Sequence, residues 1–389
     1  MMEKQENRDT IPLRKFVAPE FVFGAGARRL VGRYARHFGA QKVLIVTDPG
    51  LIATGWTEEV IASLQEEGLA HVLFSGVTPN PRAKEVMDGA DLYRQESCDA
   101  IVAVGGGSPM DCAKGIGIVS SNHSHILEFE GVDRVPIPAP PLICVPTTAG
   151  TAAEVSQFAI ITDRQRRIKI AIISKAVVPD VALIDPVTTT TMDAYLTACT
   201  GMDALTHACE AFVSNAHSPI TDLHALEAVR LISAYLPQAI DRLDDLEMRG
   251  KMMLGSLHAG LAFSNASLGA VHAMAHSLGG FLDFPHGEAN ALLLEHVVAF
   301  NFEEVTPRYL SLGRAMGFEI PPGKEKETFI RDIESLRKAV GIDQSLGDLG
   351  LKREEIPELA RKAIQDACIV TNPRRPTQTD IEKIYEQAL

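Results

Sequence analysis

Two kinds of sequence pattern meet near Asp185, and this change of pattern constrains the fold more than any other feature of the chain. Before it, short β-rich runs alternate with amphipathic helical patterns, whereas helical periodicity continues after it with almost no β-rich run. Alternating β and α segments are typical of a parallel sheet covered by helices on both faces. We therefore predict an α/β domain with a Rossmann-like parallel sheet over residues 1–187 and an all-α domain over residues 188–389.

The expected strands and helices follow from the spacing of apolar residues. Residues 43–46 and 100–104 are apolar without a break, as strands buried on both faces should be. The expected strands cover 43–47, 71–75, 99–104, 142–146, 158–162 and 181–184. The expected helices include 58–67 and 83–95 in the first half, and 193–213, 219–242, 246–262, 327–340, 357–367 and 379–389 in the second.

Composition excludes several classes of partner. Lys and Arg together number 37 and Asp and Glu 50, which gives a net charge of −13. Because the chain is acidic and its longest basic cluster is the short segment 164–167, we expect neither nucleic acid nor an anionic membrane as its partner. Residues 252–282 contain no Lys, Arg, Asp or Glu, but their histidines, serines and glycines make them too polar for a membrane span.

Cysteine usage and the N-terminal segment indicate the compartment. The six cysteines form no C-x-x-C pair, and we interpret them as buried, reduced thiols. The first fourteen residues are polar and show no signal-peptide pattern, so the sequence predicts a cytoplasmic location.

A glycine-rich segment follows the expected strand 99–104 and opens a helix. It reads Gly105, Gly106, Gly107, Ser108 and then a proline. Three glycines let the backbone approach a ligand closely, and a helix N-terminus adds partial positive charge, which is typical of a phosphate site. The alternative is a tight strand–helix turn, and the order differs from G-x-G-x-x-G. A second glycine pair at residues 24 and 26 lacks a third glycine, and we interpret it as a turn.

Two further segments follow expected strands and suit a nucleotide. Asp48 ends the strand 43–47, where a carboxylate accepts hydrogen bonds from ribose hydroxyls and repels a 2′-phosphate. An Asx turn with the following Pro-Gly is the alternative interpretation of Asp48. Thr147 and Thr148 follow the strand 142–146 and offer hydroxyl groups to a nucleotide groove.

Metal-ligand spacing occurs in the helical half. Asp203 and His207 are four residues apart, as are His272 and His276, so each pair shares one face of a helix; His286 follows. One carboxylate with two or three imidazoles suits a divalent first-row metal such as iron, zinc or manganese. The spacing leaves open whether His272 or His276 is the ligand, and hydrogen-bonded core histidines are the alternative.

A nucleotide-binding half and a metal-binding half predict chemistry in the cleft between them. A metal binds a hydroxyl group and lowers its pKa, and a nicotinamide cofactor accepts or donates a hydride. The sequence therefore predicts an oxidoreductase that acts on a small hydroxyl compound.

Together these segments resemble the iron-containing (group III) alcohol dehydrogenase family from about residue 16 to the C-terminus. The matching motifs lie at 105–114, 146–151, 201–207, 263–266, 271–280, 285–291 and 371–374. Many members read Gly-Thr-Gly-Ser-Glu where this chain has Ala152 and Ala153 in the third and fourth places. The Ala-Ala form is similar to the lactaldehyde reductase branch, and it lacks a serine hydroxyl near the cofactor.

The resemblance implies a role for each candidate residue. It implies that the metal ligands are Asp203, His207, His272 and His286, and that His276 is a proton-relay or positioning residue beside the metal and the nicotinamide. It implies cofactor contacts by Asp48 (ribose), by Gly105, Gly106, Gly107 and Ser108 (pyrophosphate), by Thr147 and Thr148 (adenine and phosphate) and by Lys169 (ribose or phosphate). Phe263 and Cys368 match positions near the substrate pocket.

The resemblance also implies cofactors and assembly. We expect NAD, Fe²⁺ with Zn²⁺ or another divalent metal as the alternative, a small primary alcohol or diol and its aldehyde as substrates, and a homodimer or higher homo-oligomer. The rival functions are a zinc-dependent glycerol dehydrogenase, a dehydroquinate synthase-like lyase and a non-catalytic nucleotide and metal sensor. The lyase needs several Lys and Arg residues in its cleft, and residues 252–282 contain none.

Overall fold

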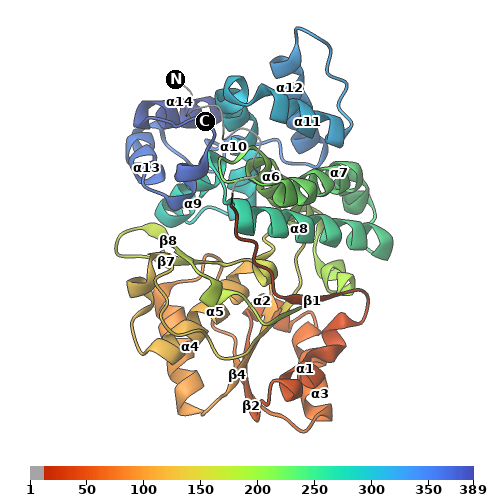
Figure 1. The fold of residues 1–389 in the computed structure, drawn as a ribbon, viewed down its shortest axis with the longest axis vertical. Helices are drawn as coiled ribbons and strands as arrows, with labels where there is room; N and C mark the ends of the chain where they lie inside the picture. The colour runs from red at the N-terminus through yellow and green to blue at the C-terminus, as the bar shows by residue number, and fades with distance from the viewer. Residues whose placement is uncertain (1–12) are drawn as a thin grey trace.

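A sheet-containing part and an all-helical part lie one above the other in the computed structural model, which describes residues 13–389 (Figure 1). The sheet-containing part holds all the strands of the described chain, from β1 to β9, and the helical part begins with α6 (Ala194–Val213). This arrangement confirms the predicted α/β fold with an all-α second part. The expected division at residues 187 and 188 falls inside the short 3₁₀ helix η5 (Pro186–Thr191).

The main sheet has six strands, and every pairing within it is parallel. Its spatial order is β1 (Glu20–Phe23), β9 (Val181–Ile184), β6 (Leu142–Pro146), β4 (Ala100–Gly105), β2 (Lys42–Val46) and β3 (Ala70–Phe74). Each strand expected from the sequence in this sheet agrees with the structure within one residue at either end, and β1 joins it as an edge strand that the sequence pattern did not predict.

Helices cover both faces of this sheet because side chains alternate along each strand. Leu44 and Val46 of β2 pack with α4 (Ala83–Gln95) and α5 (Gly107–Asn122) on one face. Val43 and Ile45 pack with α1 (Val31–His37) and α3 (Trp56–Glu66) on the other. All residues of β4 and β6 are buried, as their unbroken apolar sequences require.

The expected strand 158–162 is present, but it does not belong to the parallel sheet that the alternation of β and α segments predicts. As β7 (Phe158–Asp163) it pairs antiparallel with β8 (Ile168–Ile173), and β8 also pairs with β5 (Gly131–Val132) in a separate sheet. Four residues between β7 and β8 are too few for the crossover that a parallel pair needs. The Asp163 carboxylate closes the turn by accepting the backbone N–H groups of Gln165 and Arg166.

The helical part is built around α6, whose side chains are buried along most of its length. The helices that follow it are α7 (Pro219–Asp241), α8 (Leu246–Ala266), α9 (Ala270–Leu282), α10 (His286–Asn301), α11 (Thr306–Met316), α12 (Glu325–Ala339), α13 (Ile356–Ala363) and α14 (Gln378–Ala388). The expected helix 357–367 ends too late, because α13 stops at Ala363 and a turn leads into η8 (Ala367–Thr371). The carboxylate of Asp366 caps η8 by accepting the N–H of Cys368.

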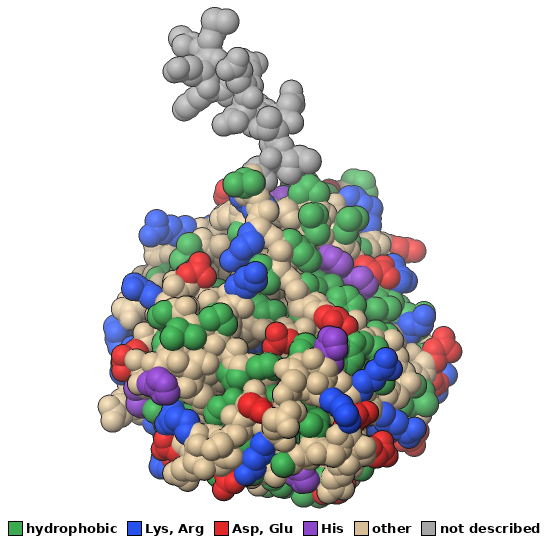
Figure 2. Space-filling model, turned by 60° about the horizontal axis from the view of Figure 1, so that its bottom comes forward, with side chains coloured by type: hydrophobic (Ala, Val, Ile, Leu, Met, Phe, Trp, Pro, Cys, Tyr) green, Lys and Arg blue, Asp and Glu red, His purple; other side chains and the backbone are tan. Residues whose placement is uncertain are grey.

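The cysteines are buried and the surface charges are mixed, as the composition predicts. All six cysteines are buried and none is paired in a disulfide. On the face drawn in Figure 2, Lys and Arg side chains lie among Asp and Glu side chains. Within residues 13–389, no helix has the length and apolar character that crossing a membrane requires. Of the segment used to predict the absence of a signal peptide, residues 1–12 lie outside the described structure.

Candidate active site

The carboxyl ends of β2, β4 and β6 bring three of the predicted cofactor segments to one edge of the sheet. Asp48 follows β2, Gly105 ends β4, and Thr147 follows β6. The chain passes from β2 to β3 on one side and then returns to β4 on the other, so the strand order reverses between β2 and β4. Ligands of open α/β sheets bind in the crevice at such a reversal.

The glycine segment has a backbone that no other residue would adopt without strain. Gly105 has a φ of +150°, and a Cβ on it would lie 2.6 Å from Cγ of Pro109. A Cβ on Gly107 would lie 2.9 Å from the Thr151 side chain. Helix α5 begins at Gly107, and no side chain caps it. Its first N–H groups therefore face outward from a closely packed loop, which is a suitable site for a phosphate.

Asp48 and the threonine loop border the same edge of the sheet. Oδ1 of Asp48 accepts the N–H of Leu51 at 2.9 Å and so caps the short helix α2 (Pro49–Ile52). One carboxylate oxygen of Asp48 therefore makes the local backbone contact that the Asx-turn interpretation expects. The other oxygen accepts no hydrogen bond from the described residues. Thr147 is buried and donates its N–H to the carbonyl of Gly105 at 2.9 Å, while Thr148 packs against Gly106.

The other glycine pair is a structural turn, as predicted. Gly26 lies in the left-handed region with a φ of +94°, and its N–H donates to Oδ2 of Asp185 at 2.9 Å. The N–H of Gly24 donates to the carbonyl of Ile184. Both contacts hold the end of β1 against the end of β9.

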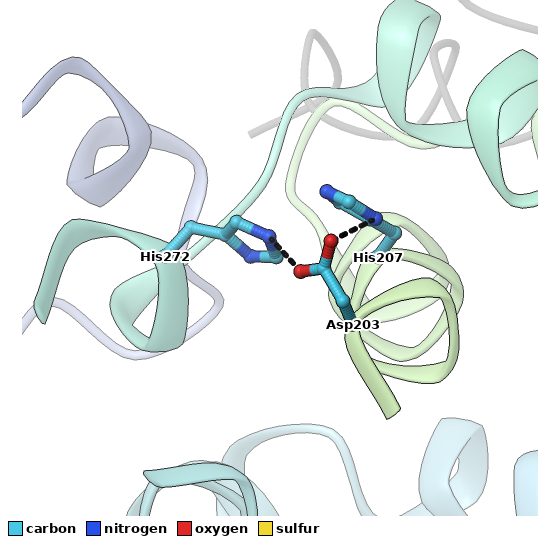
Figure 3. Close-up of side chains that lie close together, drawn as sticks. All are labelled: Asp203, His207 and His272. Atoms are coloured by element: carbon cyan, nitrogen blue, oxygen red, sulfur yellow. Dashed lines mark ion pairs between the residues drawn. The ribbon is translucent and has the colours of Figure 1, made fainter. Parts of the chain in front are cut away.

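Three helices bring the predicted metal-ligating side chains together. Asp203 and His207 lie on α6, His272 lies on α9, and their candidate ligand atoms are all within 4.8 Å of one another (Figure 3). His286, the first residue of α10, has its Nε2 3.8 Å from Oδ1 of Asp203. His276 faces a different carboxylate, with Nδ1 2.9 Å from Oδ2 of Asp366.

The electrostatics of this cluster suit a cation. Asp203 is buried, and its ion-pair partners in the described chain are histidines, with no Lys or Arg among them. Burial lowers the pKa of His207 to about 3 and that of His286 well below its usual range. Against the effect of burial, hydrogen bonds to Asp203 and Glu210 raise the pKa of His272 to about 9.

An unpartnered atom of the cluster supports the same fit. Nδ1 of His207 is buried, lies 4.0 Å from Oδ2 of Asp203 and has no hydrogen-bond partner in the described residues. A buried carboxylate beside the neutral imidazoles of His207 and His286 suits a divalent first-row metal, whose charge would compensate the carboxylate and replace the proton that His272 holds. The four residues therefore fit a metal ion.

Two residues beside the cluster were missed by the sequence analysis. Asn290 donates Nδ2 to Oδ1 of Asp203 at 2.6 Å, and Oε2 of Glu210 lies 2.6 Å from Nδ1 of His272. Both follow a predicted ligand by one helical turn, since Glu210 is three residues after His207 and Asn290 is four after His286. That spacing was the available signal.

A cavity of about 160 Å³ joins the metal cluster to the N-terminus of α5. The predicted site residues that line it are Gly107, Ser108, Lys169, His207, Phe263, His272, His276 and His286. Its apolar wall includes Phe158, Ile160 and Leu268, and Phe263 stacks on His207 with ring centroids 4.3 Å apart. Ala153 also lines the cavity.

The remaining predicted residues do not line this cavity. Asp48, Gly105, Gly106, Thr147 and Thr148 lie at the carboxyl ends of β2, β4 and β6. Cys368 is buried next to His276 and Asp366, with candidate ligand atoms of all three within 4.8 Å of one another. Lys169 is half-buried on β8; desolvation lowers its pKa to about 8, although Asp111, Asp203 and other carboxylates oppose the shift.

Comparison with known proteins matches both parts of the chain. Residues 18–186 match the model of the family described as iron-containing alcohol dehydrogenase, and residues 197–389 match that of its C-terminal region. A 1,3-propanediol dehydrogenase of Citrobacter freundii is 42% identical over 371 residues, which cover 94% of this chain and 96% of the relative. An NAD-dependent methanol dehydrogenase of Bacillus methanolicus is 39% identical, covering 96% of this chain and 99% of the relative.

Solved structures agree with the sequence comparisons. A crystal structure of a 1,3-propanediol oxidoreductase superposes with a TM-score of 0.94 at 40% identity, covering 97% of this chain and all of the other.

Proposed function

This chain belongs to the iron-containing alcohol dehydrogenase family, and we propose that it oxidises short unbranched primary alcohols or small diols in the cavity described above. It is an enzyme that transfers a hydride between NAD(H) and an alcohol–aldehyde pair, and it uses a metal. The relatives named for 1,3-propanediol and methanol support the choice of small alcohols.

One observation carries the proposal: Ser108 at the α5 N-terminus and His272 of the metal cluster border the same cavity of about 160 Å³. A cofactor held at the α5 N-terminus and a substrate beside the metal cluster would thus meet in one small space. The apolar wall of Phe158, Ile160 and Leu268 suits the carbon chain of a small alcohol or diol.

We assign the metal site to Asp203, His207, His272 and His286, with Fe²⁺ as the proposed metal. When bound, the metal supplies Lewis acidity at the substrate oxygen and the nicotinamide accepts the hydride. Asn290 holds Asp203 in place through its amide N–H. The neutral side chains of His207 and His286 keep a lone pair available for coordination.

The proposed cofactor contacts divide by chemistry. The backbone N–H groups of Gly107 and Ser108 bind the pyrophosphate. Gly105 and Gly106 have no side chains and so let the backbone approach the pyrophosphate closely. The free oxygen of Asp48 accepts from the ribose hydroxyls of the adenosine. Thr147 and Thr148 border the adenine and the phosphate, and the Lys169 ammonium, which lines the cavity, reaches the ribose or the phosphate.

His276 is the proposed proton-relay or positioning residue. Its ring lines the cavity, and Asp366 accepts a hydrogen bond from its Nδ1, which leaves Nε2 to exchange a proton on the other side of the ring. Phe263 packs on His207 and shapes the substrate end of the cavity, and Cys368 fills the space behind His276 and Asp366.

Reduction of NAD followed by absorbance tests the proposal. Protein purified without oxygen is analysed for its metal and then supplied with ferrous iron, NAD and a series of methanol, ethanol, 1-propanol, 1-butanol, 1,2-propanediol and 1,3-propanediol. We expect NADH formation with at least one of these alcohols and iron in the purified protein. Metal-loaded protein that binds NAD but oxidises none of them would contradict the proposal and favour the sensor function.

The lyase alternative is disfavoured by the charge of the cavity. A phosphorylated acid needs several cationic side chains around it, but Lys169 is the single Lys or Arg among the described residues that line the cavity. Zinc-dependent glycerol oxidation is tested by adding glycerol to the alcohol series and zinc to the metals.

For assembly and location, we propose a cytoplasmic homodimer or higher homo-oligomer. The edge strand β1 carries Phe21 and Phe23, which are 41% and 38% exposed, and a second copy would bury them. The six unpaired cysteines suit a reducing compartment. A monomeric mass by light scattering at micromolar protein concentration would contradict the assembly proposal.

A further inference from the structure

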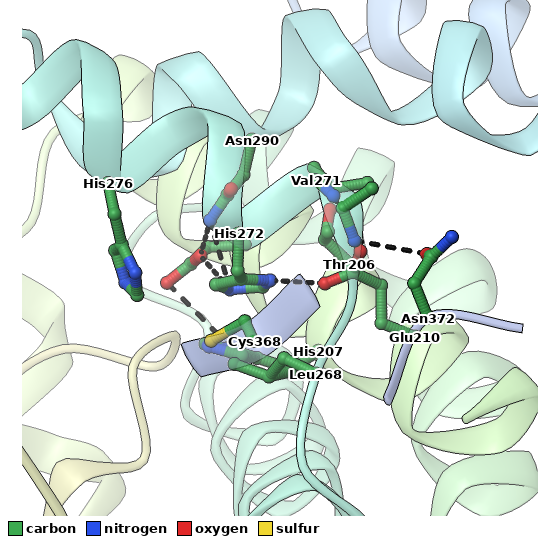
Figure 4. A network of polar contacts seen from close by, with 12 residues as sticks. Thr206, His207, Glu210, Leu268, Val271, His272, His276, Asn290, Cys368 and Asn372 are labelled. Carbon is green, nitrogen blue, oxygen red and sulfur yellow. Dashed lines mark hydrogen bonds and ion pairs between the residues drawn. The ribbon is translucent and has the colours of Figure 1, made fainter. Parts of the chain in front are cut away.

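We propose that Glu210 is a positioning residue for the metal site, because it holds His272 in the tautomer whose Nε2 faces the other ligands. Oε2 of Glu210 lies 2.6 Å from Nδ1 of His272, and both side chains are buried (Figure 4). This inference rests on the proposed metal site, and it adds a residue to which neither the sequence analysis nor the proposed function gives a role.

The tautomer follows from the chemistry of the contact. An ionised carboxylate only accepts hydrogen bonds, so the imidazole proton must lie on Nδ1 for this contact to form. In the neutral imidazole that metal coordination requires, the lone pair is then on Nε2, which lies 3.7 Å from Oδ1 of Asp203. A metal-ligating histidine commonly donates its other N–H to a carboxylate, which fixes the orientation of its ring and raises its basicity.

Glu210 has a second contact that fixes the helix carrying His272. Its Oε1 accepts the backbone N–H of Val271 at 2.7 Å, near the start of α9. Helix α9 begins after Gly269, which offers no side-chain cap, and its first N–H, on Ala270, donates to Oδ1 of Asn372 at 3.1 Å. Glu210 therefore joins α6, which carries Asp203 and His207, directly to the start of α9.

The surroundings of Glu210 argue for a role beyond helix capping. Its carboxylate is buried, and in the described chain its ion-pair partner is His272, with no Lys or Arg in contact. A neutral amide would cap the helix at lower desolvation cost, as Asn372 does for the adjacent N–H. A carboxylate supplies a second acceptor oxygen, and here that oxygen faces Nδ1 of His272.

The substitution Glu210→Gln separates the two contacts. The amide oxygen of Gln still accepts the Val271 N–H, but its NH₂ group then faces Nδ1 of His272 and favours the opposite tautomer. We expect the folded variant, checked by circular dichroism and NAD binding, to bind Zn²⁺ about 10–100-fold more weakly in competition with a chromophoric chelator. An unchanged affinity for Zn²⁺ would overturn the inference.

Asn372→Ala is the matched control, because it removes the other cap of α9 without touching the Glu210–His272 contact. We expect its affinity for Zn²⁺ to stay within about threefold of the unmodified protein. An equal loss of affinity in both variants would mean that Glu210 acts only through the helix, which overturns the inference.

A spectroscopic measurement keeps the inference testable if Glu210→Gln fails to fold. In the Zn²⁺-loaded protein labelled with ¹⁵N-histidine, we expect His272 to carry its proton on Nδ1, and a proton on Nε2 would overturn the inference. Failure of the proposed metal site is recognised separately, since His286→Ala would then leave the affinity for Zn²⁺ unchanged.

Discussion

Nδ1 of His276 lies 2.9 Å from Oδ2 of Asp366, so the imidazole proposed to act beside the nicotinamide is held by a residue ninety positions away. The other carboxylate oxygen of Asp366 accepts the N–H of Cys368 at 2.8 Å, which fixes the carboxylate in turn. His276 and His286 stack with ring centroids 5.4 Å apart. The orientation of the proposed relay therefore depends on the turn between α13 and η8.

The first prediction concerns this contact. Asp366→Asn keeps an oxygen for the Cys368 N–H but weakens the hold on His276. We expect kcat for alcohol oxidation to fall by about 10²-fold, as for a misplaced reacting group, while metal content stays unchanged. Steady-state kinetics and elemental analysis on one preparation measure both. Unchanged kcat would show that Asp366 does not position His276.

The second prediction separates metal ligands from the relay. His272→Ala and His286→Ala should lose the metal and reduce turnover to background even with saturating NAD. His276→Ala should retain the metal and lose about 10²–10⁴-fold in kcat, the typical effect of removing an acid–base group. If His276→Ala is metal-free while His272→Ala keeps its metal, the two roles are exchanged.

The third prediction concerns cofactor choice. The free oxygen of Asp48 would face the 2′-phosphate of NADP, so we expect the enzyme to prefer NAD over NADP. The substitution Asp48→Gly removes this repulsion and should reduce the preference for NAD. The ratio of kcat/KM for the two cofactors measures this. Since Asp48 also caps α2, Asp48→Asn serves as a control that retains the cap without the charge. A preference of the unmodified enzyme for NADP would contradict the assignment.

The fourth prediction is a pH dependence of NAD binding. Burial lowers the pKa of Lys169 from 10.5 to about 8, so its ammonium is present below this pH and is lost as the pH rises through it. An anionic cofactor selects the charged form, and its affinity should fall by up to about tenfold per pH unit above pH 8. In Lys169→Arg the guanidinium stays charged over this range, so the affinity for NAD should no longer depend on pH. The Kd for NAD between pH 6 and 10 measures this for both proteins. Parallel curves for the two proteins would exclude Lys169 as the titrating group.

The fifth prediction concerns stability. Asp185 is fully buried, and its Oδ2 lies 2.6 Å from Nη1 of the buried Arg28 while also accepting the Gly26 N–H. Asp185→Ala should lower the free energy of unfolding in urea by about 1–3 kcal/mol, because it leaves Nη1 of Arg28 and the Gly26 N–H without an acceptor while Glu59 still pairs with the guanidinium. Lys84→Ala is the control: it breaks the exposed ion pair with Asp88 and should cost at most about 1 kcal/mol. Similar losses in the two variants would contradict this account.

Much of the fold was predictable because its signals are local. The unbroken apolar run of β4 and the amphipathic pattern of α4 specify a buried strand and a surface helix through the spacing of neighbouring residues. The glycine segment before α5 and the pair Asp203 and His207 on α6 follow from the same local rules.

The sequence pattern failed where the outcome depends on which elements meet. The residues of β7 look like any short buried strand, and only the turn to β8 and its pairing place them outside the parallel sheet. Likewise, α13 ends before Asp366 because that residue caps η8 and holds His276, and neither contact is visible in helical periodicity.

By itself, then, the sequence determined the α/β and all-α parts, the glycine loop and the helical pairs of candidate ligands, since each depends on residues within a few positions of one another. The tertiary structure decided that His272 faces Asp203 while His276 faces Asp366, and that Glu210 lies against His272. It also places the methyl of Ala152, whose backbone is left-handed with a φ of +47°, against Gly260, where any Cβ would clash with it. These outcomes depend on contacts between helices and loops far apart in the chain, which packing sets and local spacing does not encode.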